Sequence, residues 1–435
     1  MKSETLEGRF AVKRQTTLKA GAWAVSIAAV VSLAACSSSS KSSSNSTSNS
    51  SSAPAAGGTY TLWDPYPQLD DSSNWGQVVQ KCGTSNGVTV KRTSVDTTDL
   101  TNKVLLAAQQ KNAPNVLIVD NPVVSTLASA GVLLDTGQTS QSTSDYAPNL
   151  LGAGQVGGKT YGVPIGANTL ALWYNKTLMT SLGIDPTSIT DWTSLNSALA
   201  KAVAAGKKGI TFAAIGTEEG SFQFEPWFWG AGANLTDLSS SQSVSALQLW
   251  TDWVKKGIAP QTVLQNNQTT SWQEFSTGNF LFGENGTWQT AQSGKLSFET
   301  GVIPIPSSSG GVAPAPTGGE FVTVPKQSDS SKDATSGKIA SCLASAQSAL
   351  TTDTALGYIS AIKSVQSQQV AQTPALQVWV SAVNVAQGRT ANNLGTKYPK
   401  ISEQLWTAVQ AALSGSKSPQ AAMSAAQSAA KAATS

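Results

Sequence analysis

After residue 58, hydrophobic positions alternate between short strand-like runs and helix-like repeats. Three runs have the length and composition of strands: residues 59–63, 88–92 and 115–119. Between the second and third, Leu100 and Val104 recur at the spacing of one helix face, and Pro114 prevents that helix from continuing. The third run is continuously apolar, as in strands buried on both faces of a parallel sheet. The pattern predicts an α/β fold with an open sheet.

Polar and aromatic side chains follow the first and third predicted strands. Trp63, Asp64 and Tyr66 lie at the end of the first, and Asp120 and Asn121 at the end of the third. Open α/β sheets bind ligands outside the carboxyl ends of their strands, so these residues are candidate ligand contacts. For the two acids, loop shaping is the competing interpretation, because Asp and Asn commonly build turns.

The rest of the chain is dominated by helical patterns. Residues 192–203 and 244–254 form amphipathic repeats, and in the second Trp250 and Trp253 are spaced for packing. Near the end we expect a helix over residues 403–413 and a last, Ala-rich helix over 419–433 that frays at its end.

The first 58 residues differ from everything after them. Basic residues precede a short apolar run, 20–35, that is shorter than the roughly 20 residues a membrane span needs. It ends in Leu33, Ala34, Ala35 and Cys36, which resembles a bacterial lipobox. We expect a signal peptide over residues 1–35, lipidation of Cys36, and a disordered Ser-rich tether over 36–58. Ordinary secretion, with Cys36 incidental, is the alternative.

Composition narrows the possible chemistry. Removing residues 1–35 leaves 23 basic and 23 acidic residues, so we expect no nucleic-acid partner. The absence of histidine excludes Ser-His and Cys-His catalysis and His-ligated zinc. We expect no metal and no cofactor. The sequence leaves open whether Cys82 and Cys342, 260 positions apart, form a disulfide.

A series of motifs resembles the maltose-binding-like carbohydrate-binding proteins of ABC importers. The motifs occur in the family's order, at residues 161–164 (YGVP), 174–176 (YNK), 225–230 (EPWFWG), 275–280 (FSTGNF), 285–288 (NGTW), 301–304 (GVIP) and 318–321 (GGEF). The resemblance implies a periplasmic-binding-protein-like fold, with two α/β lobes, a hinge and a ligand cleft between them. We assign residues 59–166 and 287–325 to lobe I, and 167–286 and 326–435 to lobe II.

The resemblance also implies ligand-contacting residues. A sugar needs flat aromatic faces for its C–H surfaces and polar groups for its hydroxyls. We expect Trp227 and Trp288, with Trp63, to stack on ligand from loops or strand ends, and Trp406 to lie near the cleft. The remaining predicted contacts are Tyr66, Asp120, Asn121, Asn168, Gly319 and Glu320.

These features favour the substrate-binding component of an ABC importer over an enzyme. We expect a monomer that is lipid-anchored on the extracytoplasmic side of the cell membrane, binds a sugar or oligosaccharide and delivers it to the permease subunits. Three alternatives remain: a glycosidase using two carboxylates from among Asp64, Asp120, Glu225 and Glu320, a binding protein for a non-sugar solute, and a lipoprotein adhesin or scaffold.

Overall fold

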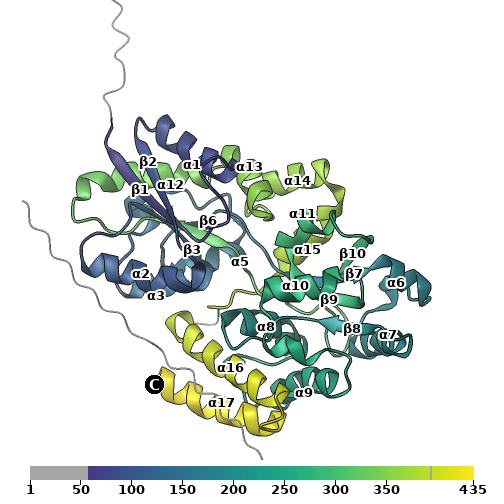
Figure 1. Ribbon diagram of the computed structural model, residues 1–435. Coiled ribbons are helices and arrows are strands. Elements are labelled where there is room, and N and C mark those ends of the chain that lie inside the picture. Colours follow the sequence, from purple (N-terminus) through teal and green to yellow (C-terminus); the bar gives the residue numbers. More distant parts are fainter. Residues whose placement is uncertain (1–56, 392–393) are drawn as a thin grey trace, which may run out of the picture. The chain divides into compact units, whose positions relative to one another are not determined.

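The computed structural model describes residues 57–391 and 394–435 (Figure 1). The expected signal peptide, Cys36 and all of the tether before Gly57 lie outside the described residues. Within the described ranges, no helix combines the length and the apolar character needed to cross a bilayer.

Lobe I is built on a five-stranded sheet. Its strands, in order across the sheet, are β2 (Thr89–Ser94), β1 (Thr59–Asp64), β3 (Val116–Asp120), β11 (Glu320–Thr323) and β6 (Val163–Pro164). Strands β1, β2 and β3 are parallel, whereas β11 runs antiparallel to both β3 and β6. The carboxyl ends of β1 and β3 therefore lie at one edge, where β11 begins. The strands expected at 59–63, 88–92 and 115–119 are confirmed within one or two residues.

Helices cover both faces of this sheet. Side chains of β3 alternate between the two faces: Val116 and Ile118 pack on one, and Leu117 and Val119 on the other. The first face is covered by α1 (Asn74–Ser85), α12 (Asp333–Leu343) and α13 (Ala346–Leu356), and the second by α2 (Thr97–Gln109) and α3 (Asn121–Ser129) (Figure 1). A disulfide between Cys82 and Cys342 joins α1 to α12 and answers the question that the sequence left open.

Lobe II contains the second sheet. Its strand order is β10 (Thr300–Ile303), β7 (Leu170–Asn175), β9 (Phe280–Gly286) and β8 (Lys208–Thr211). The helices around it are α6 (Lys176–Ser181), α7 (Trp192–Ala204), α8 (Glu218–Gly230), α9 (Ser241–Lys255), α10 (Gln268–Ser276), α16 (Tyr398–Leu413) and α17 (Pro419–Thr434). The expected helices at 192–203, 244–254, 403–413 and 419–433 are confirmed, and Trp250 and Trp253 are buried in the core as predicted.

Smaller elements complete the chain. The short helices are α4 (Thr136–Thr139), α5 (Pro148–Leu151) and α11 (Thr290–Ser293); α14 (Lys363–Gln372) and α15 (Gln377–Val385) follow α13; and β4 (Gln155–Val156) pairs with β5 (Lys159–Thr160). The 3₁₀ segments are η1 (Gly152–Gly154), η2 (Pro186–Ser188), η3 (Gln261–Leu264), η4 (Thr287–Gln289), η5 (Ser330–Lys332), η6 (Pro374–Leu376) and η7 (Gly395–Lys397).

Three segments cross between the lobes side by side. Ala167 exchanges two backbone hydrogen bonds of 2.8 Å with Ile359, and the next residue, Asn168, exchanges a pair of 3.2 and 2.9 Å with Gly318. The crossovers therefore form a narrow ribbon, which is the hinge between the two sheets.

The lobe boundaries differ from those expected. Strand β10 pairs with β7 and therefore belongs to lobe II, although we placed residues 287–325 in lobe I. Helices α12 and α13 pack on lobe I, although we placed residues 326–435 in lobe II. Both divisions cross the hinge three times, but the second crossing lies near Gly318 and the third near Ile359, instead of after residues 286 and 325.

Candidate functional site

A buried ion pair fixes the loop that follows β1. The Asp64 side chain is fully buried, and its two oxygens accept hydrogen bonds of 2.5 and 2.9 Å from Arg92. The indole of Trp75 donates a third bond of 2.9 Å to Asp64, and Arg92 also donates to the carbonyl of Tyr66 at 2.8 Å. Asp64 is therefore a structural anchor, and its effect is to hold Tyr66 at the carboxyl edge of the sheet.

Two tyrosines meet Glu320 at this edge. The Tyr66 hydroxyl donates to Glu320 Oε2 at 3.2 Å, and the Tyr358 hydroxyl donates to the same oxygen. Glu320 pairs in register with Asp120 across β11 and β3. Burial, reinforced by the charge of Asp120, raises the pKa of Glu320 to about 7. Glu320 therefore exchanges a proton near neutral pH, where most carboxyls are fully ionised.

Arg389 joins the two lobes. Its side chain is 2% exposed, and it donates to Asp120 Oδ1 of lobe I and to Glu218 Oε1 of lobe II, both at 2.7 Å. The guanidinium also lies 4.9 Å from the ring centroid of Phe222, as in a cation–π contact. Burial alone would lower the pKa of Arg389, but the two carboxylates more than offset it and raise that pKa well above its ordinary value. Arg389 therefore carries its charge while enclosed.

Glu225, a buried carboxyl on α8, joins the cluster of Arg389, Asp120 and Glu218 through Tyr398. The Tyr398 hydroxyl lies 2.5 Å from Glu218 Oε1 and 2.9 Å from Glu225 Oε1. A hydroxyl carries one proton, so bonding to both carboxyls requires a proton on one of them. Burial, followed by the charge of Glu218, raises the pKa of Glu225 well above its ordinary value. We therefore assign the proton to Glu225, which is fully buried.

Three predicted contacts lie in the hinge. The Asn121 amide donates to the carbonyls of Thr317 and Gly319, at 2.8 and 3.3 Å, and the residue is 1% exposed. Gly319 has a φ of +98°, and a β-carbon there would lie 2.5 Å from the Gly166 carbonyl oxygen, so only glycine fits. The Asn168 side chain packs against Gly318. In this structure the three residues build the hinge, and their contact with ligand stays a prediction.

The prediction that Trp227 lies in a loop or at a strand end is wrong. Trp227 lies inside α8 and is fully buried, and its indole donates to Glu284 at 2.8 Å. Its ring packs 4.9 Å from that of Trp253, edge to face. With no exposed surface, the ring is part of the lobe II core and not of a ligand surface.

The other three predicted tryptophans are partly exposed. Trp63 is the second-to-last residue of β1 and packs in part on the α2 and α3 side of the sheet. Trp288, in η4, lies 6.5 Å from Phe222 and folds back over Gly286, where a β-carbon would collide with its ring. Trp406 lies on α16, about two turns after Tyr398.

Sequence reasoning missed five residues of this site: Phe222, Glu218, Tyr358, Arg389 and Tyr398.

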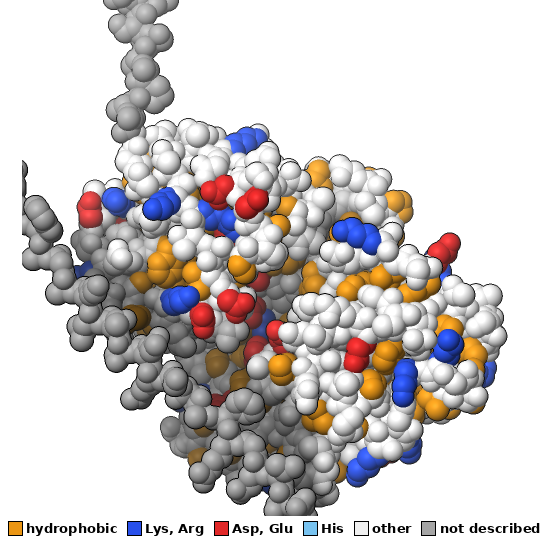
Figure 2. Space-filling model, viewed as in Figure 1, with side chains coloured by type: hydrophobic (Ala, Val, Ile, Leu, Met, Phe, Trp, Pro, Cys, Tyr) orange, Lys and Arg blue, Asp and Glu red, His pale blue; other side chains and the backbone are white. Residues whose placement is uncertain are grey.

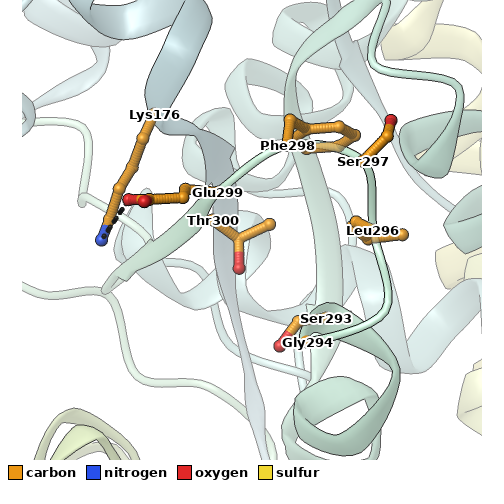
Figure 3. A pocket seen from close by; sticks show the side chains of 8 residues that line it. All are labelled: Lys176, Ser293, Gly294, Leu296, Ser297, Phe298, Glu299 and Thr300. Carbon is orange, nitrogen blue, oxygen red and sulfur yellow. Dashed lines mark ion pairs between the residues drawn. The ribbon is translucent and has the colours of Figure 1, made fainter.

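Figure 2 shows a hollow between the regions of α3 and α8, with acidic side chains gathered around it. Other depressions lie far from the hinge. One is lined by Lys176, Phe298 and Glu299 at the opposite end of β7 (Figure 3), where Lys176 and Glu299 form an exposed ion pair of 3.7 Å. Within the described residues, no group of three or more His, Cys, Asp or Glu side chains is arranged to hold a metal ion.

Comparison with known proteins places this arrangement among binding proteins. Its fold is similar to that of three solved structures. An ABC transporter solute-binding protein from Thermotoga lettingae TMO, bound with α-D-tagatose, is 22% identical, with 86% of this chain and 99% of that chain covered and a TM-score of 0.75. The GacH receptor of Streptomyces glaucescens GLA.O, solved with acarbose, is 24% identical, with 86% and 98% covered and a TM-score of 0.75.

The third, UgpB from Mycobacterium tuberculosis in complex with glycerophosphocholine, is 19% identical, with 86% and 98% covered and a TM-score of 0.74. The family of bacterial extracellular solute-binding proteins matches residues 77–378, more than half of the chain. The chain, with its two α/β lobes and hinge, therefore belongs to the bacterial extracellular solute-binding protein family.

Proposed function

We propose that this protein is the substrate-binding component of an ABC importer, which captures a sugar or oligosaccharide between its lobes and delivers it to the permease. One observation carries the proposal: carboxylates of both lobes meet beside the hinge. Asp120 and Glu320 come from lobe I and Glu218 from lobe II, and Arg389 lies between them. A ligand that contacts both groups favours the closed state by its differential affinity for that state.

The side chains beside the hinge suit a polyhydroxylated ligand. Carboxylates accept hydrogen bonds from hydroxyls, and partly exposed aromatic rings cover apolar sugar faces. We propose Asp120, Glu320 and Tyr66 as hydroxyl partners, and Trp63, Trp288 and Trp406 as the aromatic surfaces. The tagatose and acarbose bound by two similar proteins support a sugar as ligand.

Binding is also better supported than catalysis. A glycosidase needs two carboxyls free to act on one bond. Asp64 is enclosed in its ion pair with Arg92, and Asp120 is paired with Arg389. Glu225 is fully buried against Tyr398. These contacts favour structural and binding roles for the carboxyls, and we propose that the protein has no enzymatic activity and uses no cofactor.

We further propose that Cys36 carries the lipid that anchors the protein to the outer face of the cell membrane. The motif from Leu33 to Cys36 supports this, as does membership of an extracellular family. The protein would act there as a monomer that presents its loaded form to the permease subunits.

Calorimetric titration of the full-length chain carrying Cys36→Ser tests the ligand class. The probes are maltose, maltotriose, tagatose and acarbose, together with glycerophosphocholine, an amino-acid mixture and a tripeptide. We expect saturable binding of at least one carbohydrate and release of that carbohydrate unchanged. Binding of glycerophosphocholine, amino acids or peptide alone would overturn the sugar assignment, and appearance of cleaved sugar would overturn the assignment as a binding protein.

A further inference from the structure

The backbone around Arg389 belongs to the hinge. Arg389 follows α15, and two residues before it the Gln387 amide donates to the Ala315 carbonyl at 2.9 Å. In return, the Thr317 amide donates to the Gln387 carbonyl at 2.8 Å. The residues that Gln387 contacts lead directly into Gly318 and Gly319. Arg389 is therefore held at the pivot, from which its side chain reaches both lobes.

The side chain makes its two ion pairs to different lobes. Asp120 is the last residue of β3 and caps α3 in lobe I, whereas Glu218 begins α8 in lobe II. One oxygen of each carboxylate lies 2.7 Å from a guanidinium nitrogen of Arg389. On the lobe II side, Glu218 is held by Ser402, which donates to its other oxygen at 2.5 Å. Both partners are thus positioned by their own lobes, and the two bonds coexist only when the lobes are close.

The two ion pairs of Arg389 are buried on the arginine side and should therefore stabilise the protein more than exposed ion pairs do. Exposed ion pairs contribute little, because water screens them and their side chains lose freedom. Arg389 is 2% exposed and packs on the face of Phe222, so breaking its pair with one lobe leaves a buried charge with part of its compensation missing. The Nε of Arg389 has no hydrogen-bond partner among the described residues, so the guanidinium depends on these two carboxylates.

We propose that Arg389 is an interlobe latch, which stabilises the closed arrangement through protein contacts alone. The latch raises the fraction of molecules that are already closed before ligand arrives. Apparent affinity is the intrinsic affinity multiplied by that fraction, so the latch strengthens capture of any ligand that needs closed lobes. This role is independent of which solute the protein carries, and its first test requires no ligand.

Distance measurement between spin labels tests the latch directly. The full-length chain carrying Cys36→Ser receives one label in lobe I at Lys103→Cys and one in lobe II at Lys256→Cys, positions that are 54% and 65% exposed. In the ligand-free protein we expect Arg389→Gln to lower the closed-to-open ratio at least tenfold. Glu218→Gln should disturb folding less than Arg389→Gln, because the Glu218 side chain is 36% exposed. It should shift the closed-to-open ratio in the same direction.

Arg92→Gln is the matched control for the distance measurement. Arg92 is 4% exposed and pairs with a fully buried Asp64, but both residues belong to lobe I. Its loss should lower stability and leave the label separation unchanged. If Arg92→Gln shifts the separation as much as Arg389→Gln does, general loosening explains the effect and the latch is wrong.

Affinity provides a second, quantitative test. For a carbohydrate that binds the parent, the loss of affinity in Arg389→Gln should equal the loss in closed fraction measured without ligand, because Arg389 is not among the proposed ligand contacts. An unchanged distance distribution in both Arg389→Gln and Glu218→Gln would refute the latch. If affinity fell while the distances stayed unchanged, Arg389 would act through direct ligand contact instead.

Discussion

Glu320 should make the stability of the protein depend on pH near neutrality. Its pKa is raised from 4.5 to about 7 in the folded protein, because the carboxyl is buried beside Asp120. Between these values the folded state holds a proton on Glu320 that the unfolded chain releases. The contribution of the Glu320 carboxyl to the free energy of unfolding is therefore fully present below pH 4.5 and is lost as pH rises through 7. At 1.36 kcal/mol per pKa unit, the loss is about 3 kcal/mol.

Glu320→Gln isolates this effect. Glutamine has the shape of the protonated carboxyl and does not ionise, so the variant should match the parent near pH 4.5. Above pH 7 the variant should be more stable than the parent by up to about 3 kcal/mol. Denaturant unfolding of both proteins from pH 4.5 to 8 gives the difference directly. Burial also raises the pKa values of Glu225, Glu284 and Asp353, but these carboxyls are present in both proteins and their contributions cancel.

Glu299→Gln is the control, because its side chain is 84% exposed. It should leave the pH dependence of the parent unchanged. Parallel curves for the parent and Glu320→Gln would refute the assigned proton. A variant that is instead less stable than the parent above pH 7 would show that the two tyrosines stabilise the ionised carboxylate more than burial opposes it.

Three further predictions follow from the site and the fold. Replacing Cys82 and Cys342 by serine opens a loop of 260 residues and should lower the free energy of unfolding by up to ~5 kcal/mol, measured by denaturant melts. Trp227→Ala should cost about 3–5 kcal/mol of stability, whereas Trp288→Ala should mainly weaken sugar binding in calorimetry; the reverse pattern would overturn both assignments. Cys36→Ser should move the protein from the membrane fraction into the medium or leave it unprocessed, and unchanged membrane attachment would contradict lipidation.

Local pattern predicted the elements of this fold well, because the signals that define them are local. Asp191 caps α7 with both bonds of a capping box, and Pro114 separates α2 from β3. The positions at the carboxyl ends of β1 and β3 also followed from sheet geometry alone. The position of the third hinge crossing was not predictable in this way, since it is defined by the pairing of Ile359 with Ala167, which lies 192 positions earlier.

Trp227 shows why a motif can mislead about a side chain. The motif at residues 225–230 implied a loop or strand end that carries a stacking ring, but the whole motif, Pro226 included, lies within α8. Every residue from Gly220 to Gly230 is buried, so this part of the helix is enclosed on all sides and presents no periodic stripe. A stripe would have told the core face from the ligand face. Without one, the sequence could not show that the ring of Trp227 faces Trp253.

One signal in the sequence could have found Arg389. Among the 28 basic residues, arginine occurs at four positions only: 9, 14, 92 and 389. In the described residues every other cation is lysine, and both arginines are buried and bonded to carboxylates. Lysine suffices for a solvated surface, whereas a planar guanidinium is needed where one side chain must hold two partners and lie on a ring. In a chain that uses lysine everywhere else, each arginine of the folded body therefore marks a built contact: Arg92 within lobe I, and Arg389 between the lobes.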